Sequence, residues 1–413
     1  MAELLRVDDA RLVEAPPMPS DLRSVAMVTT WRTQCGIADY TSDLSEALAD
    51  AGLECGTVEI DQQRLRYMTE TELHAEFARL AERAAGADVV HVQHEYGFFA
   101  GAYGWGVSLR VFQRFLRTLR RQGQRVVVTM HTEPVFLDDA GTSPHDRLRF
   151  LGRRRLWWSL SRAVNADPGV QLVVHSRSTR RRLVDSGLRA SRLTVVPQGI
   201  PAPRAAVDAS ARSRARAELG VDGDAVVLGM FGFMSRYKGY GIALEALRSL
   251  PPEYHLLILG APHPLGGDSA LEDVLAVLQR RKSLRDRVHL TGFVPASRLA
   301  GLRASVDVCI APYLTRPRLS SSAALSWALA SDRPVLASRI PAFEELSEDG
   351  GCVQLVNPER PRELAHAVQQ LVADPERQAE LVANASAYSA ANAWSVRARQ
   401  HLAVYAALRR DAG

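Results

Sequence analysis

The strongest constraint on the fold is a pattern of short apolar runs that alternate with helical stretches. In the first half of the chain, the runs 24–30, 88–94 and 125–130 are buried-strand patterns, and two further runs follow at 171–175 and 193–197. Amphipathic stretches separate most of them. Because a parallel strand is buried on both faces, this pattern predicts a parallel sheet covered by helices on each side.

The same pattern restarts in the second half of the chain. Five more apolar runs occupy 226–231, 255–259, 288–290, 306–310 and 334–337. A chain of 413 residues is also long enough for two domains. We therefore predict two consecutive doubly wound α/β domains: an N-terminal domain 1–203, an interdomain connection 204–218, a C-terminal domain 219–392 and a final helical segment 393–413.

Composition narrows the function classes. The net charge of +5 is a mild excess, which fits an anionic small ligand better than a nucleic acid. Only Lys238 and Lys282 are lysines, so each lysine is more informative than in an ordinary chain. Four scattered cysteines without a CxxC pair predict free thiols and a reducing, cytoplasmic compartment. We expect no signal peptide and no transmembrane helix.

Ligands of doubly wound sheets bind outside the carboxyl ends of the strands. The residues that follow the predicted strands include several short motifs. Their order along the chain is Gly36–Tyr40, Val195–Gly199, Gly232–Gly239, Thr291–Phe293, Ala311–Tyr313, Ala328–Val335 and Glu345–Gly350. Each motif is weak alone, but their shared order across two domains is specific.

This series of motifs resembles the GT-B-fold, retaining glycosyltransferases of family 4, also called group 1, from about residue 24 to 410. The resemblance implies two Rossmann-like domains that face a central cleft, with the acceptor on the N-terminal domain and the nucleotide-sugar on the C-terminal domain. It also implies that the last helix crosses back to the N-terminal domain. The expected reaction transfers a sugar to a hydroxyl-bearing acceptor without a covalent enzyme intermediate.

The loop 231–239 is the best candidate for the donor diphosphate. A strand ends there, and a predicted helix starts at Gly241; N–H groups at such a helix start attract phosphate. The resemblance assigns the diphosphate to Lys238 and Gly239. The family's usual arginine after the first glycine is replaced by Phe233, so Arg236 is the candidate to supply a guanidinium. Gly36 would allow its loop to approach the phosphate closely.

A second donor segment precedes the predicted helix 323–329. Ser320, Ser321 and Ser322 either cap this helix or present its N–H groups to phosphate. The family usually has two glutamates here, but the matching positions hold Leu319 and Trp327. Arg318, Glu345 and Phe293 are therefore the candidates for the sugar or the nucleoside. Glu345 is alternatively a surface carboxylate.

On the acceptor side, the candidates follow two strands of the N-terminal domain. The resemblance places a histidine such as His131 beside the transferred sugar, and Glu133 is a possible base. His94, Glu95 and Tyr96 are possible acceptor contacts. The alternative for His94 and His131 is an ordinary, hydrogen-bonded histidine. No compact set of metal ligands is visible, and Asp222-Gly-Asp224 is expected to be a turn, so we predict a metal-independent enzyme without a cofactor.

The arginine-rich run 147–162 contains Trp157 and Trp158 and has partial helical amphipathicity. We expect a solvated helix, with peripheral docking on a membrane surface as its main alternative. For the whole chain, the alternatives to a transferase are a pseudoenzyme that binds nucleotide-sugars without turnover and a nucleotide-sugar epimerase. The donor base, the sugar, the acceptor and the oligomeric state stay open.

Overall fold

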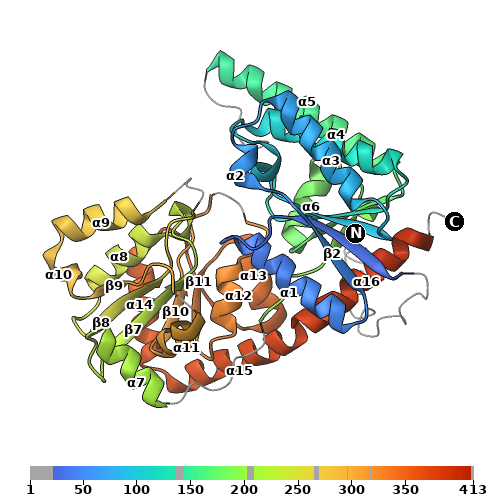
Figure 1. Cartoon of the computed structure of the whole chain (residues 1–413). Helices are drawn as coiled ribbons and strands as arrows, with labels where there is room; N and C mark the ends of the chain where they lie inside the picture. Colours follow the sequence, from blue (N-terminus) through green and yellow to red (C-terminus); the bar gives the residue numbers. More distant parts are fainter. Residues whose placement is uncertain are drawn as a thin grey trace, which may run out of the picture. The chain divides into compact units, whose positions relative to one another are not determined.

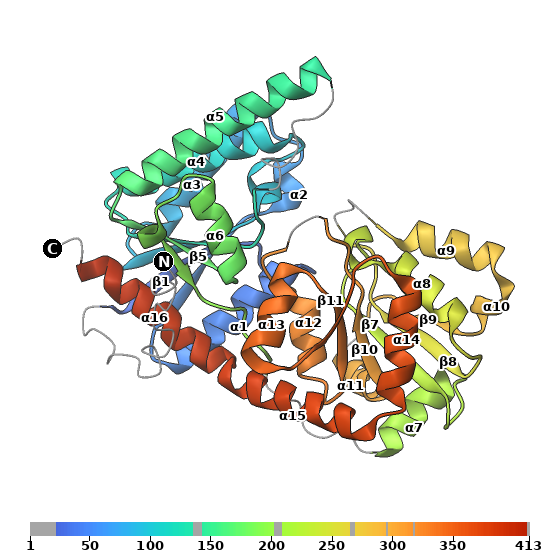
Figure 2. The same cartoon turned by 180° about the vertical axis from the view of Figure 1, so that it is seen from behind.

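The computed structural model describes residues 22–134, 143–201, 209–264, 269–294, 296–316 and 319–410. Within these ranges the chain forms two compact units. Unit 1 extends to Pro197 and includes the terminal segment from Trp394, whereas unit 2 runs from Gln198 to Ala393. Each unit contains one six-stranded sheet with helices on its faces (Figures 1 and 2). The predicted doubly wound α/β architecture is confirmed.

The sheet of unit 1 is parallel, with strand order β2-β1-β3-β4-β5-β6. Its strands are β1 (Ser24–Thr29), β2 (Glu54–Glu59), β3 (Val89–His94), β4 (Val126–Met130), β5 (Val170–Val174) and β6 (Leu193–Val195). The described helices are α1 (Gly36–Asp50), α2 (Gln62–Leu65), α3 (Glu70–Ala84), α4 (Trp105–Arg121), α5 (Pro144–Ala166), α6 (Arg177–Asp185) and α16 (Trp394–Arg410), with 3-10 turns η2 (Tyr96–Phe99) and η4 (Ala190–Arg192).

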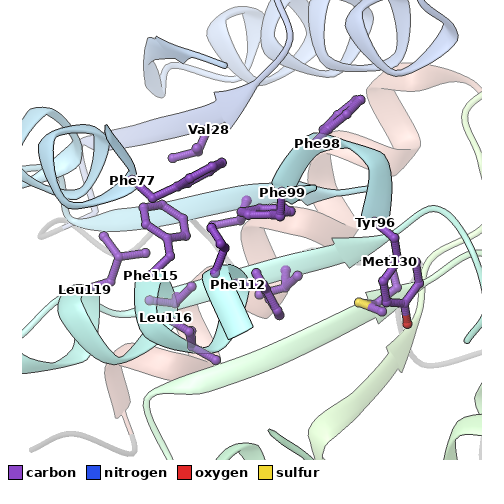
Figure 3. Close-up of a cluster of buried hydrophobic side chains, with 14 of the residues drawn as sticks. Val28, Phe77, Tyr96, Phe98, Phe99, Phe112, Phe115, Leu116, Leu119 and Met130 are labelled. Atoms are coloured by element: carbon purple, nitrogen blue, oxygen red, sulfur yellow. The ribbon is translucent and has the colours of Figure 1, made fainter. Parts of the chain in front are cut away.

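The two faces of this sheet have separate cores. One face packs against α3 and α4 through stacked and edge-on aromatic rings that include Phe77, Phe99 and Phe115 (Figure 3). The other face packs against α1 and α16, whose buried side chains include Leu44 and Tyr405. The C-terminal helix is thus part of unit 1, and its apolar side chains pack with α1 on one face of the first sheet.

Unit 2 has strand order β12-β11-β10-β7-β8-β9, again parallel. Its strands are β7 (Val226–Phe231), β8 (Tyr254–Leu259), β9 (Val288–Leu290), β10 (Val308–Ala311), β11 (Val335–Ser338) and β12 (Gln354–Val356). The helices are α7 (Ala209–Glu218), α8 (Tyr240–Ser249), α9 (Leu271–Arg280), α10 (Lys282–Arg285), α11 (Ala296–Ala304), α12 (Ala323–Leu329), α13 (Pro341–Gly350), α14 (Pro361–Val372) and α15 (Pro375–Ala391), with the 3-10 turn η5 (Arg236–Lys238).

The strand order reverses once in each sheet, and this point is where doubly wound folds bind ligands. In unit 2 the reversal lies between β7 and β10, because the chain moves to β8 on one side and returns to β10 on the other. The segments that follow these two strands, 232–239 and 312–316, are therefore neighbours. In unit 1 the reversal lies between β1 and β3, and β4 is the next strand beyond β3.

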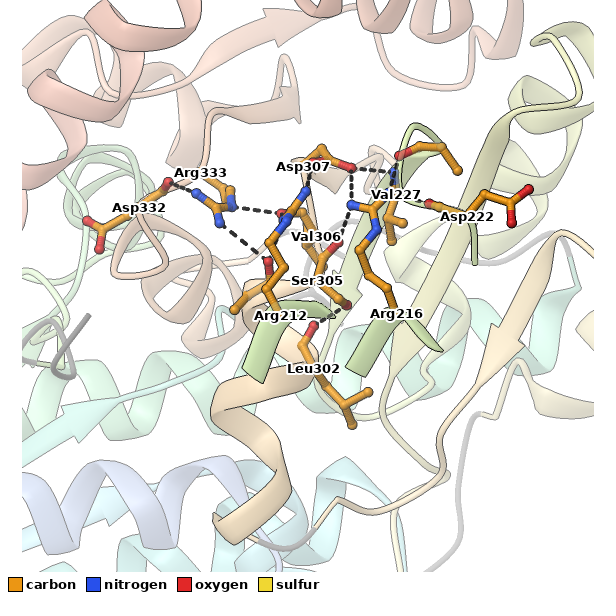
Figure 4. A network of polar contacts seen from close by, with 12 residues as sticks. Arg212, Arg216, Asp222, Val227, Leu302, Ser305, Val306, Asp307, Asp332 and Arg333 are labelled. Atoms are coloured by element: carbon orange, nitrogen blue, oxygen red, sulfur yellow. Dashed lines mark hydrogen bonds and ion pairs between the residues drawn. The ribbon is translucent and has the colours of Figure 1, made fainter. Parts of the chain in front are cut away.

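The stretch 204–218, predicted as an interdomain connection, contains helix α7 over its described part. An arginine clamp ties α7 to strand β10 (Figure 4). Arg212 Nη2 donates to Asp307 Oδ1 at 2.5 Å, and Arg216 Nη1 donates to Asp307 Oδ2 at 3.3 Å. Asp307 Oδ2 also accepts from the backbone N–H of Val227 at 2.7 Å. One carboxylate therefore holds a helix and two strands together.

We expect Asp307→Ala to lower the free energy of unfolding of unit 2 by about 3 kcal/mol, because the buried Arg216 guanidinium loses its counter-charge. Thermal or urea unfolding measures the change. The matched control is Glu218→Ala, which removes an exposed ion pair with Arg298 and is expected to change the free energy by less than about 1 kcal/mol. Equal effects of the two variants would contradict the structural role of the clamp.

Candidate functional site

Lys238 lies at the end of the loop that joins β7 to α8. Only 6% of its surface is exposed, and its Nζ donates to the carbonyl oxygen of Phe231 at 3.1 Å. Burial lowers the pKa of Lys238 to about 7. An ammonium group has three N–H donors, so one carbonyl leaves donors available for an anion. Lys238 is thus a buried amine, and an anion bound beside it would favour its protonated, charged form.

Glycines shape the loop around this lysine. Gly232 has φ +81°, and a Cβ there would lie 2.8 Å from Lys238 Nζ and 3.4 Å from the Cβ of Ala324. Gly239 has φ +76°, and a Cβ there would lie 1.9 Å from the carbonyl oxygen of Pro312. Both positions need glycine, for backbone conformation and for space. They bring the loop against the start of α12 and the end of β10.

The serines predicted to flank α12 have two different environments. Ser322 is the N-cap of α12, where its Oγ accepts from the N–H of Leu325 at 3.2 Å. Ser322 Oγ also lies 2.9 Å from the hydroxyl of Tyr313, which follows β10. Ser320 is buried, whereas Ser321 is half-buried. Ser322 therefore caps the helix, as one of the two sequence interpretations expected.

The other predicted donor residues are more dispersed. Arg236 turns toward α9, where its Nε donates to Asp273 Oδ2 at 2.7 Å in an exposed ion pair. Glu345 lies on α13 and is half-buried. Phe293 follows β9 and is 61% exposed. Arg318 lies outside the described residues. Unit 2 thus gathers Lys238, Gly239 and Ser322, whereas Arg236 has a carboxylate partner elsewhere.

In unit 1, His131 follows β4 and belongs to a buried chain of polar side chains. Its Nε2 lies 2.8 Å from the side-chain amide of Gln93, and its Nδ1 lies 3.4 Å from His175 Nε2. Its ring packs edge-on against Tyr40, with ring centroids 4.9 Å apart. Burial holds the pKa of His131 well below its usual value. His131 is therefore a neutral ring in a fixed orientation.

The hydrogen-bond pattern indicates the tautomer of this ring. His175 Nδ1 lies 3.0 Å from the carbonyl oxygen of Val196, which can only accept, so His175 Nε2 must be the unprotonated nitrogen. The Gln93 Oε1 atom, 2.8 Å from His131 Nε2, also can only accept, so His131 Nε2 carries the proton and donates to Gln93. His131 Nδ1 is then the unprotonated nitrogen of this ring. The chain continues from Gln93 through His91 to Tyr405 on α16.

Gln93→Glu tests this pattern because it keeps the shape of the side chain but places a carboxylate beside His131. We expect the pKa of His131 to rise toward its ordinary value, so that a new histidine titration is detected between about pH 5 and 8 by NMR. In the wild-type protein, burial holds the pKa of this ring well below its ordinary value. Gln113→Glu, the same exchange on the outer helix α4, is the control. An unchanged titration in Gln93→Glu would contradict the assigned contact.

The two predicted glutamates of unit 1 have defined partners. Glu133 is buried; its Oε1 accepts from the Thr179 hydroxyl at 2.7 Å and its Oε2 pairs with Arg182 Nε at 2.7 Å. Glu95 accepts a short hydrogen bond from the Thr132 hydroxyl, and burial raises the pKa of Glu95. Glu133 is thus an ion-paired anchor of α6, whereas Glu95 lies half-buried between the ends of β3 and β4.

His94 and Tyr96, the other predicted acceptor contacts, are both buried. The His94 ring is buried among Tyr96, Phe99 and Phe112, with centroid distances of 4.3 to 5.3 Å. Burial lowers the pKa of His94 to about 3. Gly36 is the first residue of α1, whose N-terminus has no side-chain cap. The ends of β3 and β4 therefore bring together Glu95, Thr132 and His131, with the His94 carbonyl oxygen accepting from the His131 backbone N–H at 3.1 Å and the His94 ring turned into the apolar core.

Two family models match complementary parts of the chain. The model described as "Glycosyltransferase Family 4" matches residues 63–204, and the model described as "Glycosyl transferases group 1" matches residues 225–374. They cover most of unit 1 and of unit 2, and both describe the same class of enzyme.

The chain belongs to the group 1, family 4 glycosyltransferases.

Two curated relatives of this transferase are both named D-inositol 3-phosphate glycosyltransferase. The D-inositol 3-phosphate glycosyltransferase of Xylanimonas cellulosilytica is 29% identical over 335 residues, which cover 79% of this chain and 73% of the relative. The enzyme of the same name from Kineococcus radiotolerans is 28% identical over 352 residues, 81% of this chain and 74% of the relative. The similarity thus spans both units.

Solved structures with the same fold cover nearly the whole transferase. Sucrose-phosphate synthase from Thermosynechococcus elongatus aligns with a TM-score of 0.71 and 21% identity over 94% of this chain and 100% of that chain. Anabaena Alr3699/HepE in complex with UDP-glucose aligns with a TM-score of 0.68 and 17% identity over 92% and 98%. Both comparisons support the predicted GT-B fold.

The transferase departs from its family's pattern at positions whose side chains have local roles. Phe233 packs on His263, with ring centroids 4.8 Å apart. Trp327 packs under the guanidinium of Arg303, whose carbon lies 4.7 Å from the ring centroid. Leu319 packs against the apolar core of unit 2. These side chains contribute apolar packing where the family usually has charged groups.

Some site residues could not be identified from the sequence. Gln93, Thr132 and Arg182 contact the predicted residues His131, Glu95 and Glu133, but no motif marked them. In the described part of the chain, no group of three or more His, Cys, Asp or Glu side chains could hold a metal ion. Asp222-Gly-Asp224 forms the predicted turn before β7.

Proposed function

We propose that this transferase binds a nucleotide-sugar with its diphosphate at Lys238 and moves the sugar to a hydroxyl-bearing acceptor on unit 1. The observation that carries the proposal is the buried Lys238 ammonium, which has one carbonyl acceptor and lies against two positions that admit only glycine. A buried cation with unused donors is stabilised by an anion. The UDP-glucose held by a structural neighbour supports a nucleotide-sugar as that anion.

Backbone groups add to the proposed phosphate site. Helix α8 begins at Tyr240, directly after Gly239, and its first N–H groups are available to an anion. Ser320 and Ser321 precede α12 at the neighbouring strand end. We propose that the diphosphate charge is balanced by Lys238 and these helix N-termini, without a metal ion. Arg236 is paired with Asp273 in an exposed ion pair, so we assign the main charge at this site to Lys238.

We propose that transfer retains the anomeric configuration and uses no covalent intermediate. In this mechanism the leaving diphosphate helps to deprotonate the acceptor hydroxyl, and the protein contributes orientation and charge stabilisation. We propose that the neutral His131 ring packs against the sugar or the acceptor in a fixed orientation, since Gln93 holds its Nε2. Glu95 is a second acceptor contact at the same strand ends. The names of the curated relatives make D-inositol 3-phosphate the first acceptor to test.

The experiment has two steps. Thermal shift with UDP, GDP, ADP and dTDP identifies the donor base, since a bound ligand raises the melting temperature. The matching nucleotide-sugars are then incubated with inositol phosphate and other polyols, and NMR gives the anomeric configuration of the product. Retention supports the proposed mechanism, whereas inversion contradicts it. An epimerised nucleotide-sugar in place of a glycoside would contradict transfer itself.

The affinity for an intact nucleotide-sugar is expected to depend on pH through Lys238. Burial lowers the pKa of the free lysine to about 7, and a bound diphosphate raises it by favouring the charged form. Affinity is therefore highest below pH 7 and falls up to about tenfold per pH unit above it, until the pKa in the complex is reached. Calorimetric titration from pH 6 to 9 measures this, with Lys238→Ala as the control that loses the dependence.

A further inference from the structure

Helix α5 carries a surface that the proposed reaction does not use. Among the described residues, seven large apolar side chains are exposed, and three of them lie on this helix: Leu148, Leu151 and Trp158. They recur at helical spacing with two arginines, in the order Leu148, Leu151, Arg155, Trp158 and Arg162. All five are exposed and lie on one face of the helix. We call these five residues the α5 stripe.

The opposite face of α5 fixes the helix to unit 1. Trp157 is only 3% exposed, whereas its neighbour Trp158 is 58% exposed. The indole N–H of Trp157 donates to the carbonyl oxygen of Ser186 at 3.1 Å. Leu160 and Val164 are buried on the same side, and α5 lies beside α4 (Figures 1 and 2). The helix is therefore anchored, and the α5 stripe is its outward face.

The charge of this surface is strongly one-sided. The helix carries six arginines, and Asp146 is its one carboxylate. The guanidinium carbon of Arg162 lies 4.9 Å from the Trp158 ring centroid, so the two side chains form a cation–π contact. A groove of about 720 Å³ between α5 and α6 includes Leu151, Arg155 and Trp158 in its walls, together with Arg154 and Arg182.

We propose that the α5 stripe docks on the surface of a membrane that contains anionic lipids. Arginine and tryptophan side chains suit the headgroup region, where guanidinium groups bind lipid phosphates, and leucines enter the acyl boundary. The groove beside the stripe adds the guanidinium group of Arg154, whereas Arg182 in its wall is already paired with Glu133. A second copy of the chain is a poorer occupant, because two α5 stripes would place like charges together. A nucleic-acid backbone offers phosphates but no apolar partner for Leu148 and Leu151.

The experiment is co-sedimentation of the full-length protein with vesicles of phosphatidylcholine alone or of phosphatidylcholine mixed with phosphatidylglycerol. We expect binding to the anionic vesicles that weakens as salt is added. The variant Leu148→Ser with Leu151→Ser and Trp158→Ser should lose roughly tenfold or more of the partition coefficient, although every charge is kept. Arg155→Ala with Arg162→Ala should lose on the order of fivefold for each arginine.

Two controls separate docking from general attraction and from unfolding. Arg66→Ala with Arg83→Ala removes the same charge from exposed positions elsewhere in unit 1 and should bind anionic vesicles almost as the wild type does. Melting curves must show that the α5 variants stay folded, as expected for exposed side chains. Equal binding by the α5 and control variants would overturn the proposal, as would wild-type protein that binds RNA but no vesicles.

Discussion

Lys238→Ala is expected to weaken binding of the donor nucleotide-sugar about 100-fold at pH 6.5, where the wild-type lysine is charged. The variant removes a buried cation that lies beside Gly232 and the start of α12. A water molecule can fill the space but cannot balance the charge of a diphosphate. Isothermal titration calorimetry measures both affinities directly.

The chain provides its own control for this experiment. Lys282, the other lysine of the sequence, is exposed on α10 in the same unit. Lys282→Ala changes the net charge by the same amount but should leave the affinity within about twofold, because exposed charges are screened by solvent and salt. Equal losses in the two variants would mean that Lys238 acts only through the overall charge.

Gly239→Ala is expected to lower the free energy of unfolding of unit 2 by roughly 3 kcal/mol and its melting temperature by about 10 °C. The backbone at Gly239 has φ +76°, which disfavours any side chain. The new Cβ would also lie 1.9 Å from the carbonyl oxygen of Pro312, so the start of α8 and the segment that follows β10 must separate. Differential scanning calorimetry measures the shift.

Gly241→Ala is the matched control, two residues farther along. A Cβ at Gly241 has no atom within 4 Å, and the residue lies inside helix α8. Alanine favours a helix over glycine by up to about 1 kcal/mol, so this variant should melt at the same or a higher temperature. A Gly239→Ala protein as stable as Gly241→Ala would contradict the close approach of the start of α8 to Pro312, which follows β10.

The central strands were predictable because they are continuous apolar runs. The predicted strands 226–231 and 288–290 agree with β7 and β9 to the residue, and 88–94 agrees with β3 within one residue. Strands β2 and β12 were missed. Both lie at a sheet edge, and β2 alternates exposed with half-buried residues instead of forming an apolar run. Edge strands need only one buried face, so hydrophobicity alone does not identify them.

The candidate site was predictable where a single residue type limits the backbone. The family resemblance assigned the diphosphate to Lys238 and Gly239, and the structure gives Gly239 a positive φ and a close approach to Pro312. Their role at the diphosphate stays a prediction. The partner of a long side chain was not predictable: the exposed ion pair of Arg236 with Asp273 on α9 follows from no motif, and the role of Arg236 at the diphosphate stays a prediction. The partners of His131 come from β3, β5 and α1. Such contacts depend on tertiary packing, which a linear motif does not encode.

The most direct test of the account is acceptor-dependent release of nucleoside diphosphate from the donor that the thermal-shift panel identifies. We expect wild-type protein to release the diphosphate in proportion to glycoside formed, and Lys238→Ala to release it at least about 100-fold more slowly at low donor concentration. Tight donor binding without release, with every acceptor class tried, would contradict a transferase and indicate a protein that binds nucleotide-sugars without turning them over.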